Sequence, residues 1–209
     1  MKTEINQSNY EKMKNSMAEV FLQYDQDNMI RKFQLEHDER YLYIRCLERP
    51  YRVSRETGQI DWSEDGFQTV NRAGYNETMT IYDVLCSSKD NCHLAGKWVS
   101  LDSLFSVMGG SLKQENSLLQ HSARIFESKT EALSLACEKL GGKKQNKGDA
   151  AYELPLFPFL PIMLCFWDSD EEFPSSLQIL PDQNVLDYMH YETLMFAVFH
   201  LIDRLKALI

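Results

Sequence analysis

The chain has 209 residues, of which 44% are hydrophobic and 25% are charged, and it carries a formal net charge of −9. A chain of this length buries roughly 70% of its unfolded surface on folding, so it can fold without disulfides or a structural metal ion. The acidic balance argues against nucleic acid and against anionic membrane surfaces as partners of the whole molecule.

The lack of a recognisable export signal and the cysteine usage both predict a cytoplasmic protein. The first residues form no apolar segment of signal-peptide length, and no run approaches the ~20 apolar residues of a membrane-spanning helix. The five cysteines are odd in number and scattered, which is typical of reduced thiols in a protein that is not exported. We therefore expect a cytoplasmic location and no membrane partner.

The first third of the sequence predicts a helical segment followed by a β meander. Apolar residues at spacings of three and four predict a helix over residues 9–24 with Ser8 as its N-cap, and a second short helix follows around residues 28–33. Alternating bulky and polar residues then predict three or four antiparallel strands among residues 33–37, 41–46, 51–54 and 59–62.

The middle of the chain predicts a loop followed by several helices. Residues 63–76 are polar and contain two glycines, and Thr78 can cap the helix that follows them. Ser128 and Glu131 fit a capping box, and Gly141 with Gly142 fits a left-handed helix stop. The predicted helices cover residues 78–86, 102–108 (stopped by Gly109 and Gly110), 114–126 and 129–140.

An apolar run organises the last third of the chain. Residues 162–167 are continuously apolar and follow Pro161, which predicts a strand buried on both faces. A second strand is expected at residues 176–180. The final helix, from about Tyr191 to Ile209, has a wide apolar stripe that predicts deep burial, and His200 lies on its polar edge as an expected surface or boundary residue.

The order of these elements predicts an α+β fold, because helices and strands are segregated along the chain and do not alternate. We expect an antiparallel β meander and a C-terminal strand pair packed against several helices, including the buried C-terminal helix. The sequence contains no repeat, linker or low-complexity tract, so residues 1–209 should form a single domain that begins with a helical segment over residues 1–30.

Several stretches resemble a known bacterial family. The run LAGKWVS at residues 94–100 looks like that family's GrWVsf element. Residues 154–180, with FP, LP and the core W-x-x-DEEFP-x-S, resemble its hallmark strand and acidic turn. The helices from Ser117 to Gly142 and from Asp182 to Leu205 follow in the expected order. Residues 33–209 are thus similar to the bacterial domain of unknown function numbered 3786.

The resemblance implies a cytoplasmic protein of an anaerobic bacterium and brings no established activity. Some relatives in that family carry an added iron–sulfur segment. This chain has no CxxC pair and nothing similar to a ferredoxin cysteine run, so no iron–sulfur cofactor is expected. The chain also has Ser169 where the family tends to have glycine.

The acidic turn after the buried strand is the candidate site. Asp168, Asp170, Glu171 and Glu172 fall within five residues, and carboxylate oxygens suit a hard divalent cation such as Mg²⁺ or Ca²⁺. Repulsion among them could also raise one pKa enough for general acid catalysis. The alternative is a solvated turn in which one carboxylate caps backbone N–H groups and the others face water.

Two hypotheses about function remain open. The first is a non-catalytic binding or interaction module with an unidentified protein or small-molecule partner, because the sequence contains no catalytic signature. The second is a small enzyme or metal-binding protein with a carboxylate-rich site over residues 167–174. In that case Trp98, Trp167 and Tyr152 would wall the pocket. Convergence of these side chains with Lys97 or a histidine would favour the enzyme, whereas carboxylates that face solvent would favour the module. Neither hypothesis fixes the oligomeric state.

Overall fold

Two antiparallel sheets and seven α-helices make up the part of the chain that the computed structural model describes, residues 8–107 and 115–209. This architecture confirms the predicted α+β class. The first sheet contains β1 (Glu36–His37), β2 (Tyr41–Cys46), β3 (Arg49–Ser54), β4 (Ile60–Trp62) and β5 (Asn71–Arg72). The second sheet contains β6 (Lys143–Lys144), β7 (Ala150–Phe157), β8 (Leu160–Trp167) and β9 (Ser176–Pro181). The helices are α1 (Asn9–Phe21), α2 (Gln26–Phe33), α3 (Tyr75–Ser87), α4 (Leu101–Val107), α5 (Glu115–Phe126), α6 (Thr130–Lys139) and α7 (Tyr191–Lys206).

The first sheet is a meander in which each strand pairs with the next one along the chain. A two-residue turn, Leu47–Glu48, joins β2 to β3, and both residues have positive φ, of 49° and 59°. Such turns match the twist of a hairpin but usually contain Asn or Gly, because a Cβ disfavours the left-handed region. The first strand is shorter than predicted, since α2 continues through Phe33 and ends at the left-handed residue Gln34.

The second sheet has the order β6-β7-β8-β9, so the expected strand pair, β8 and β9, forms one side of a larger sheet in which β9 is the edge strand. The strand predicted to be buried on both faces is β8, and this prediction is confirmed. Leu164 and Phe166 belong to the main core, whereas Met163 and Cys165 belong to an apolar cluster on the opposite face. Pro155 and Pro161 face each other across the β7–β8 pair, close to its turn.

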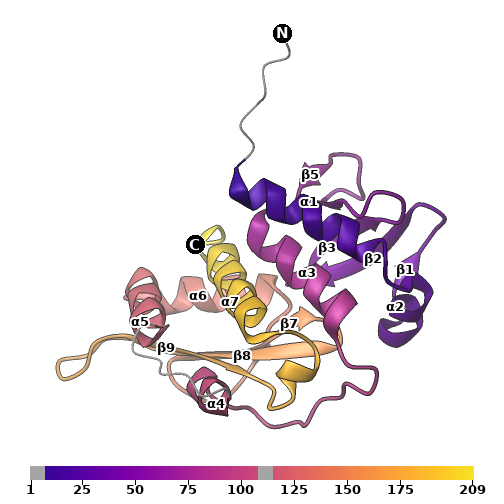
Figure 1. Cartoon of the computed structure of the whole chain (residues 1–209). Helices are drawn as coiled ribbons and strands as arrows, with labels where there is room; N and C mark the ends of the chain where they lie inside the picture. Colours follow the sequence, from indigo (N-terminus) through magenta and orange to yellow (C-terminus); the bar gives the residue numbers. More distant parts are fainter. Residues whose placement is uncertain (1–7, 108–114) are drawn as a thin grey trace.

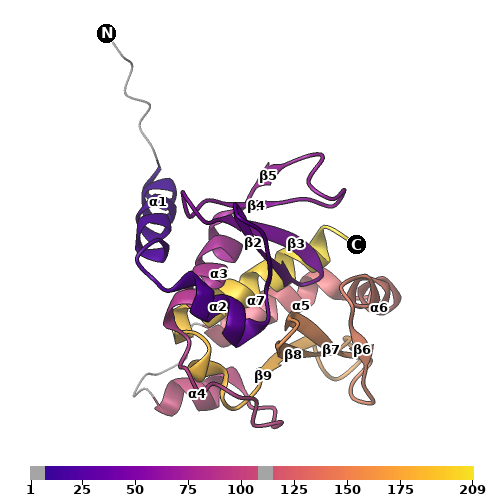
Figure 2. The same ribbon diagram turned by 90° about the vertical axis from the view of Figure 1, so that its right-hand side faces the viewer.

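The helices pack around the two sheets with α7 at the centre of the molecule (Figure 1). In both views α7 lies beside α3, and the second sheet lies below it (Figures 1 and 2). The helices α5 and α6 lie on the same side of the second sheet as α7, while α1 covers α3 (Figure 1). Among the described residues, no helix combines the length and the apolar character needed to cross a membrane.

The burial of α7 was predicted and is confirmed. Val198, Leu201 and Leu205 have no exposed surface. The helix begins where Asp83 of α3 accepts hydrogen bonds from the backbone N–H of His190, at 2.7 Å, and contacts its ring Nδ1 at 2.7 Å. This contact fixes α7 against α3 and thereby sets the position of every side chain that α7 directs toward the first sheet.

Two of the predicted helix caps are wrong, because each helix begins after a different N-cap residue. The helix α3 begins a turn earlier than expected, at the N-cap Gly74, whose N–H donates to Glu77 at 2.7 Å, while Thr78 lies buried within the helix. Ser128 forms no capping box for α6. It adopts a left-handed conformation with φ of 59°, and the N-cap residue is Lys129, whose side chain forms no capping hydrogen bond.

The predicted start of α1 and the predicted end of α6 are confirmed. The Ser8 hydroxyl accepts a hydrogen bond from the Glu11 N–H at 3.3 Å and caps α1. Gly141 follows α6 with φ of 75°, as expected of a left-handed stop. The predicted loop at residues 63–76 contains β5 and the start of α3. The predicted stop at Gly109 and Gly110 lies outside the described residues.

Candidate functional site

The predicted acidic turn connects β8 to β9 and projects beyond the strands at the left of Figure 1. Asp168 accepts hydrogen bonds from the Ser128 N–H at 2.9 Å and from the Thr130 hydroxyl at 3.0 Å, so it holds the residues that lead into α6. These bonds favour the charged carboxylate and lower the pKa of Asp168, with the Ser128 N–H contributing most.

The other acidic residues of the turn have different surroundings. Asp170 accepts hydrogen bonds from the N–H groups of Glu172 at 2.8 Å and Phe173 at 2.7 Å, and thus closes the turn itself. Glu171 and Glu172 are exposed. Across the residues described here, no group of three or more His, Cys, Asp and Glu side chains has an arrangement that could hold a metal ion. Two of the four carboxylates therefore bind backbone N–H groups.

The structure brings two of the predicted wall residues together. Trp98 and Trp167 pack against the same apolar cluster of the second sheet, formed by Ala151, Met163 and Cys165. Tyr152 is fully buried in the main core.

Lys97 is fixed through its backbone. Its N–H lies 3.3 Å from a carboxylate oxygen of the buried Asp182, and its carbonyl accepts a hydrogen bond from Gln183 at 2.8 Å. Asp182 also accepts hydrogen bonds from the N–H groups of Ala95 and Gly96, at 2.9 and 2.8 Å. The segment that resembles the GrWVsf element is therefore tied to the chain that follows β9.

A cavity of about 870 Å³ lies beneath the β2–β3 hairpin, where the first sheet meets the β7–β8 turn and the ends of α6 and α7. Sites for small molecules commonly enclose ~300–1,000 Å³. Sequence reasoning missed this site because its walls come from segments far apart in the chain. The lining residues are Phe33, Gln34, Leu35, Glu36, Tyr43, Ile44, Arg45, Glu48, Arg49, Pro50, Tyr51, Glu64, Gly66, Phe67, Lys139, Leu140, Pro158, Phe159, Arg204 and Leu208.

Unusual backbone conformations gather around this cavity. Gln34, Glu48 and Phe67 line it, and their φ angles of 51°, 59° and 65° lie in a region that non-glycine residues rarely adopt. Each such residue costs on the order of 1 kcal/mol, and such costs concentrate at functional sites. The residues with unusual backbone conformations and the cavity therefore mark the same region of the molecule.

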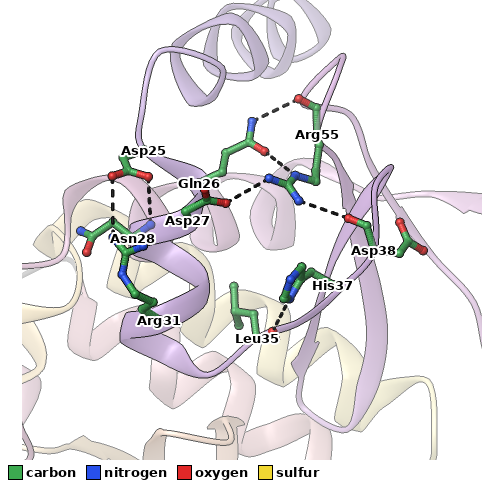
Figure 3. Close-up of polar contacts among 9 residues, drawn as sticks. All are labelled: Asp25, Gln26, Asp27, Asn28, Arg31, Leu35, His37, Asp38 and Arg55. Carbon is green, nitrogen blue, oxygen red and sulfur yellow. Dashed lines mark hydrogen bonds and ion pairs between the residues drawn. The ribbon is translucent and has the colours of Figure 1, made fainter.

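The wall that α2 contributes is fastened to the first sheet by Arg55 (Figure 3). Arg55 Nε donates to the Gln26 side-chain carbonyl at 3.1 Å, and Gln26 Nε2 donates to the Arg55 carbonyl at 3.1 Å. The Nη atoms of Arg55 donate to Asp27 at 3.1 Å and to the Asp38 carbonyl at 3.2 Å. These bonds hold Phe33 and Gln34 in position at the end of α2.

Two arginines face the same carboxylate at the cavity. Arg49 Nη2 on β3 lies 3.1 Å from Glu64 Oε1, and Arg204 Nη1 on α7 lies 3.5 Å from the same oxygen. Both arginine side chains are largely buried, with 17% and 12% exposed, whereas Glu64 is 62% exposed. Burial lowers the pKa of Arg204, and the neighbouring Arg49 lowers it further.

A buried row of polar groups lies beside these arginines. His200 Nε2 is 3.2 Å from the Tyr51 hydroxyl, and His200 Nδ1 is 3.5 Å from Glu77 Oε2. Burial lowers the pKa of His200 to about 4, so its ring is neutral near pH 7. Burial also raises the pKa of Tyr51 well above its ordinary value. Because Tyr51 lines the cavity, this row links α3 and α7 to the cavity wall.

The expectation that His200 is a surface or boundary residue was wrong. Only 6% of its surface is exposed. The sequence contains one signal that could have located it: His200 and Arg204 are four residues apart and therefore share a side of α7, directly beside the apolar positions Leu201 and Leu205. A polar pair in so apolar a helix indicates a buried polar contact.

Comparison with known protein families identifies the family of this chain. Residues 25–204 match a protein family described as a domain of unknown function, DUF3786. The match begins at the N-cap of α2 and ends within α7, so it includes both sheets and leaves α1 outside. Comparisons with curated proteins and with solved structures give no match. Because the family match spans most of the chain and includes the segments at residues 94–100 and 154–180, the chain belongs to the DUF3786 family.

Proposed function

We propose that this chain is a non-catalytic binding module whose small-molecule ligand occupies the cavity beneath the β2–β3 hairpin. One observation carries the proposal: the left-handed residues and the largely buried arginines converge on a single cavity of about 870 Å³. Walls fixed in advance favour binding, because less conformational entropy is lost when the ligand is held.

We further propose that the protein acts in the cytoplasm of an anaerobic bacterium. The family resemblance and the sequence both suggest this location. The state of the cysteines supports it, since all five are free and four of them are buried. Free thiols are usual in reducing compartments.

The competing proposal is a metal-binding or catalytic site at the acidic turn, residues 167–174. The geometry favours the cavity, because Asp168 and Asp170 already accept hydrogen bonds from backbone N–H groups. A cation would have to compete with those contacts. Thermal unfolding with and without Mg²⁺, Mn²⁺ and Ca²⁺, on the wild type and on Asp170→Ala/Glu172→Ala, would detect such a site as a stabilisation that the variant loses.

The test of the cavity proposal uses a variant that fills the cavity. Leu208 lines it and is half-buried, so Leu208→Trp should occupy part of its volume. The neighbouring Ile209 is 39% exposed and does not line the cavity, which makes Ile209→Trp the matched control.

Binding of benzoate, phenyl phosphate and benzyl alcohol would be followed through amide chemical shifts. We expect at least one probe to shift residues 43–51 and 204–208 in the wild type and in Ile209→Trp, and to lose this effect in Leu208→Trp. Shifts that persist in Leu208→Trp, or that cluster elsewhere on the chain, would refute the proposal.

A further inference from the structure

The class of ligand follows from the way in which Arg49 and Arg204 are held. The Arg49 guanidinium stacks on the Trp62 ring with its central carbon 3.8 Å from the ring centroid. This contact fixes the plane of the group, and its Nε and Nη2 atoms lie 3.3 and 3.1 Å from Glu64 Oε1. Arg49 thus offers a flat, preoriented pair of N–H donors, which is the arrangement that binds a carboxylate or phosphate with two parallel hydrogen bonds.

Arg204 adds a second guanidinium with unused hydrogen-bonding capacity. Its Nε is buried and has no hydrogen-bond partner among the described residues. A buried donor without a partner is costly, and the presence of Arg49 beside it adds repulsion between like charges. An anionic oxygen beside Arg204 Nη1, where Glu64 lies now, would offset the repulsion between the two guanidinium groups.

Glu64 is a weak occupant of this arginine pair. It contacts both guanidinium groups through one oxygen atom, Oε1, and its side chain is 62% exposed. It belongs to the connection between β4 and β5. Ion pairs with so exposed a member contribute little to stability, so little is lost when Glu64 leaves.

We infer that the ligand of this cavity carries an anionic head group, a carboxylate or a phosphate, which replaces Glu64 on Arg49 and Arg204. This inference rests on the proposed function, since it assigns a ligand class to the same cavity. The rest of the ligand is apolar or aromatic, because the same cavity contains the stacked rings of Phe33 and Phe159, whose centroids are 4.2 Å apart.

The charges around the cavity agree with this assignment. Four basic side chains and three acidic ones line it, so the cavity carries a net positive charge although the chain as a whole carries −9. Among the acidic ones, Glu48 lies 3.7 Å from Arg45 and is thus paired away from the two arginines of the site. When Glu64 is displaced, the lining becomes more positive at the point where the anion binds.

The experiment compares three probes that share a phenyl ring and differ in their head group: benzoate, phenyl phosphate and benzyl alcohol. Their affinities would be measured by calorimetry at pH 7 and low ionic strength on the full chain. The variants are Glu64→Gln, which removes the competing charge, and Glu56→Gln, which removes the same charge from an exposed position outside the cavity.

Glu64→Gln should tighten the binding of the anions by about tenfold and leave benzyl alcohol unchanged, because a charged hydrogen-bonding competitor has gone. Glu56→Gln should bind all three probes as the wild type does. The anion that gains more identifies the head group. Adding Arg49→Lys to Glu64→Gln should abolish the gain, since lysine keeps the charge and loses the planar pair of donors.

The outcomes separate this inference from the proposed function. If all three probes bind the wild type and Glu64→Gln equally, and Leu208→Trp blocks them, the cavity is a ligand site and the anionic class is refuted. If no probe binds Glu64→Gln, or if Leu208→Trp leaves binding intact, both the inference and the proposed function are refuted.

Discussion

Individual carboxylates in this protein stabilise local structure by accepting hydrogen bonds from backbone N–H groups. Asp168 accepts hydrogen bonds from the Ser128 N–H and the Thr130 hydroxyl beside the start of α6, although 40 residues separate it from Ser128 along the chain. Hydrogen bonds to a charged carboxylate are stronger than those between neutral groups, and they depend on proximity in space. The acidic turn thereby joins the second sheet to α6.

Replacing Asp168 with Ala should therefore lower the free energy of unfolding by about 1 kcal/mol at pH 7, because these hydrogen bonds are lost. The pKa of Asp168 is lowered in the folded state, so its contribution is present above its ordinary pKa and is lost as the pH falls through the folded-state value. Urea unfolding at pH 7 and below pH 4 would measure this. Asp168→Asn, which keeps one acceptor oxygen, should lose less, and an equal loss at both pH values would show that the charge of Asp168 does not strengthen these hydrogen bonds.

The buried His200 also makes the protein less stable as the pH falls, but over a higher pH range than Asp168 does. Its pKa is about 4 in the folded protein and ordinarily 6.5, so the unfolded chain binds the extra proton first as the pH falls. The folded state should lose stability progressively between about pH 6.5 and pH 4, by an amount on the order of 3 kcal/mol.

His200→Gln keeps a hydrogen-bonding partner for Tyr51 and removes the titrating group. Unfolding free energies of both proteins, measured in urea from pH 7.5 to pH 4, should show a shallower decline for the variant. Parallel curves would mean that His200 is protonated as readily in the folded state as in the unfolded chain.

At the scale of elements, the two sheets meet at the turn between β2 and β3. The Leu47 N–H donates to the Leu156 carbonyl of β7 at 3.1 Å, and Gly141 after α6 lies against Glu48. A Cβ added at Gly141 would lie 2.8 Å from Glu48 Cγ. A side chain at residue 141 would therefore displace the Glu48 side chain from the left-handed turn.

Gly141→Ala should cost about 2 kcal/mol or more, combining an unfavourable φ of 75° with this contact. Gly96→Ala is the matched control, because Gly96 has φ of 69° and nothing within 4 Å of its added Cβ, so it should cost only about 1 kcal/mol. Adding Glu48→Ala should restore part of the loss in Gly141→Ala and none in Gly96→Ala. Additive changes in both pairs would show that the contact is absent.

At the scale of the whole molecule, one hydrophobic core serves both sheets. Tyr51 of the first sheet, Phe166 of the second and Val198 of α7 belong to the same buried cluster. Neither sheet can lose its packing without exposing the apolar face of α7. This supports the prediction of a single domain, which cooperative unfolding would test directly.

The tryptophans permit that test, because Trp62 lies in the first sheet and Trp98 and Trp167 pack on the second. Fluorescence of Trp62→Phe reports the second sheet, and fluorescence of Trp98→Phe/Trp167→Phe reports the first. In guanidinium chloride, each variant's fluorescence and far-UV circular dichroism should share one midpoint. Separate midpoints for the two probes within one variant would indicate two independently folding units.

The sequence by itself determined the fold class, most element positions and the family. Helical spacing located α1 and α7, the apolar run located β8, and the glycine pair at residues 141–142 located the end of α6. These features are local, since they depend on the period of apolar residues and on backbone freedom over a few positions. The segments at residues 94–100 and 154–180 carried the family resemblance for the same reason.

The tertiary structure alone decided the contacts of Asp168 beside α6, the burial of His200 and the cavity. Asp168 reaches Ser128 across 40 residues, Tyr51 reaches His200 across 149, and Arg49 and Arg204 meet at Glu64 from different elements. Contacts of this kind are set by how sheets and helices pack, and no local pattern encodes them. The acidic turn was conspicuous in the sequence because its charges are adjacent, whereas the arginine pair was hidden because its members come together only in the folded chain.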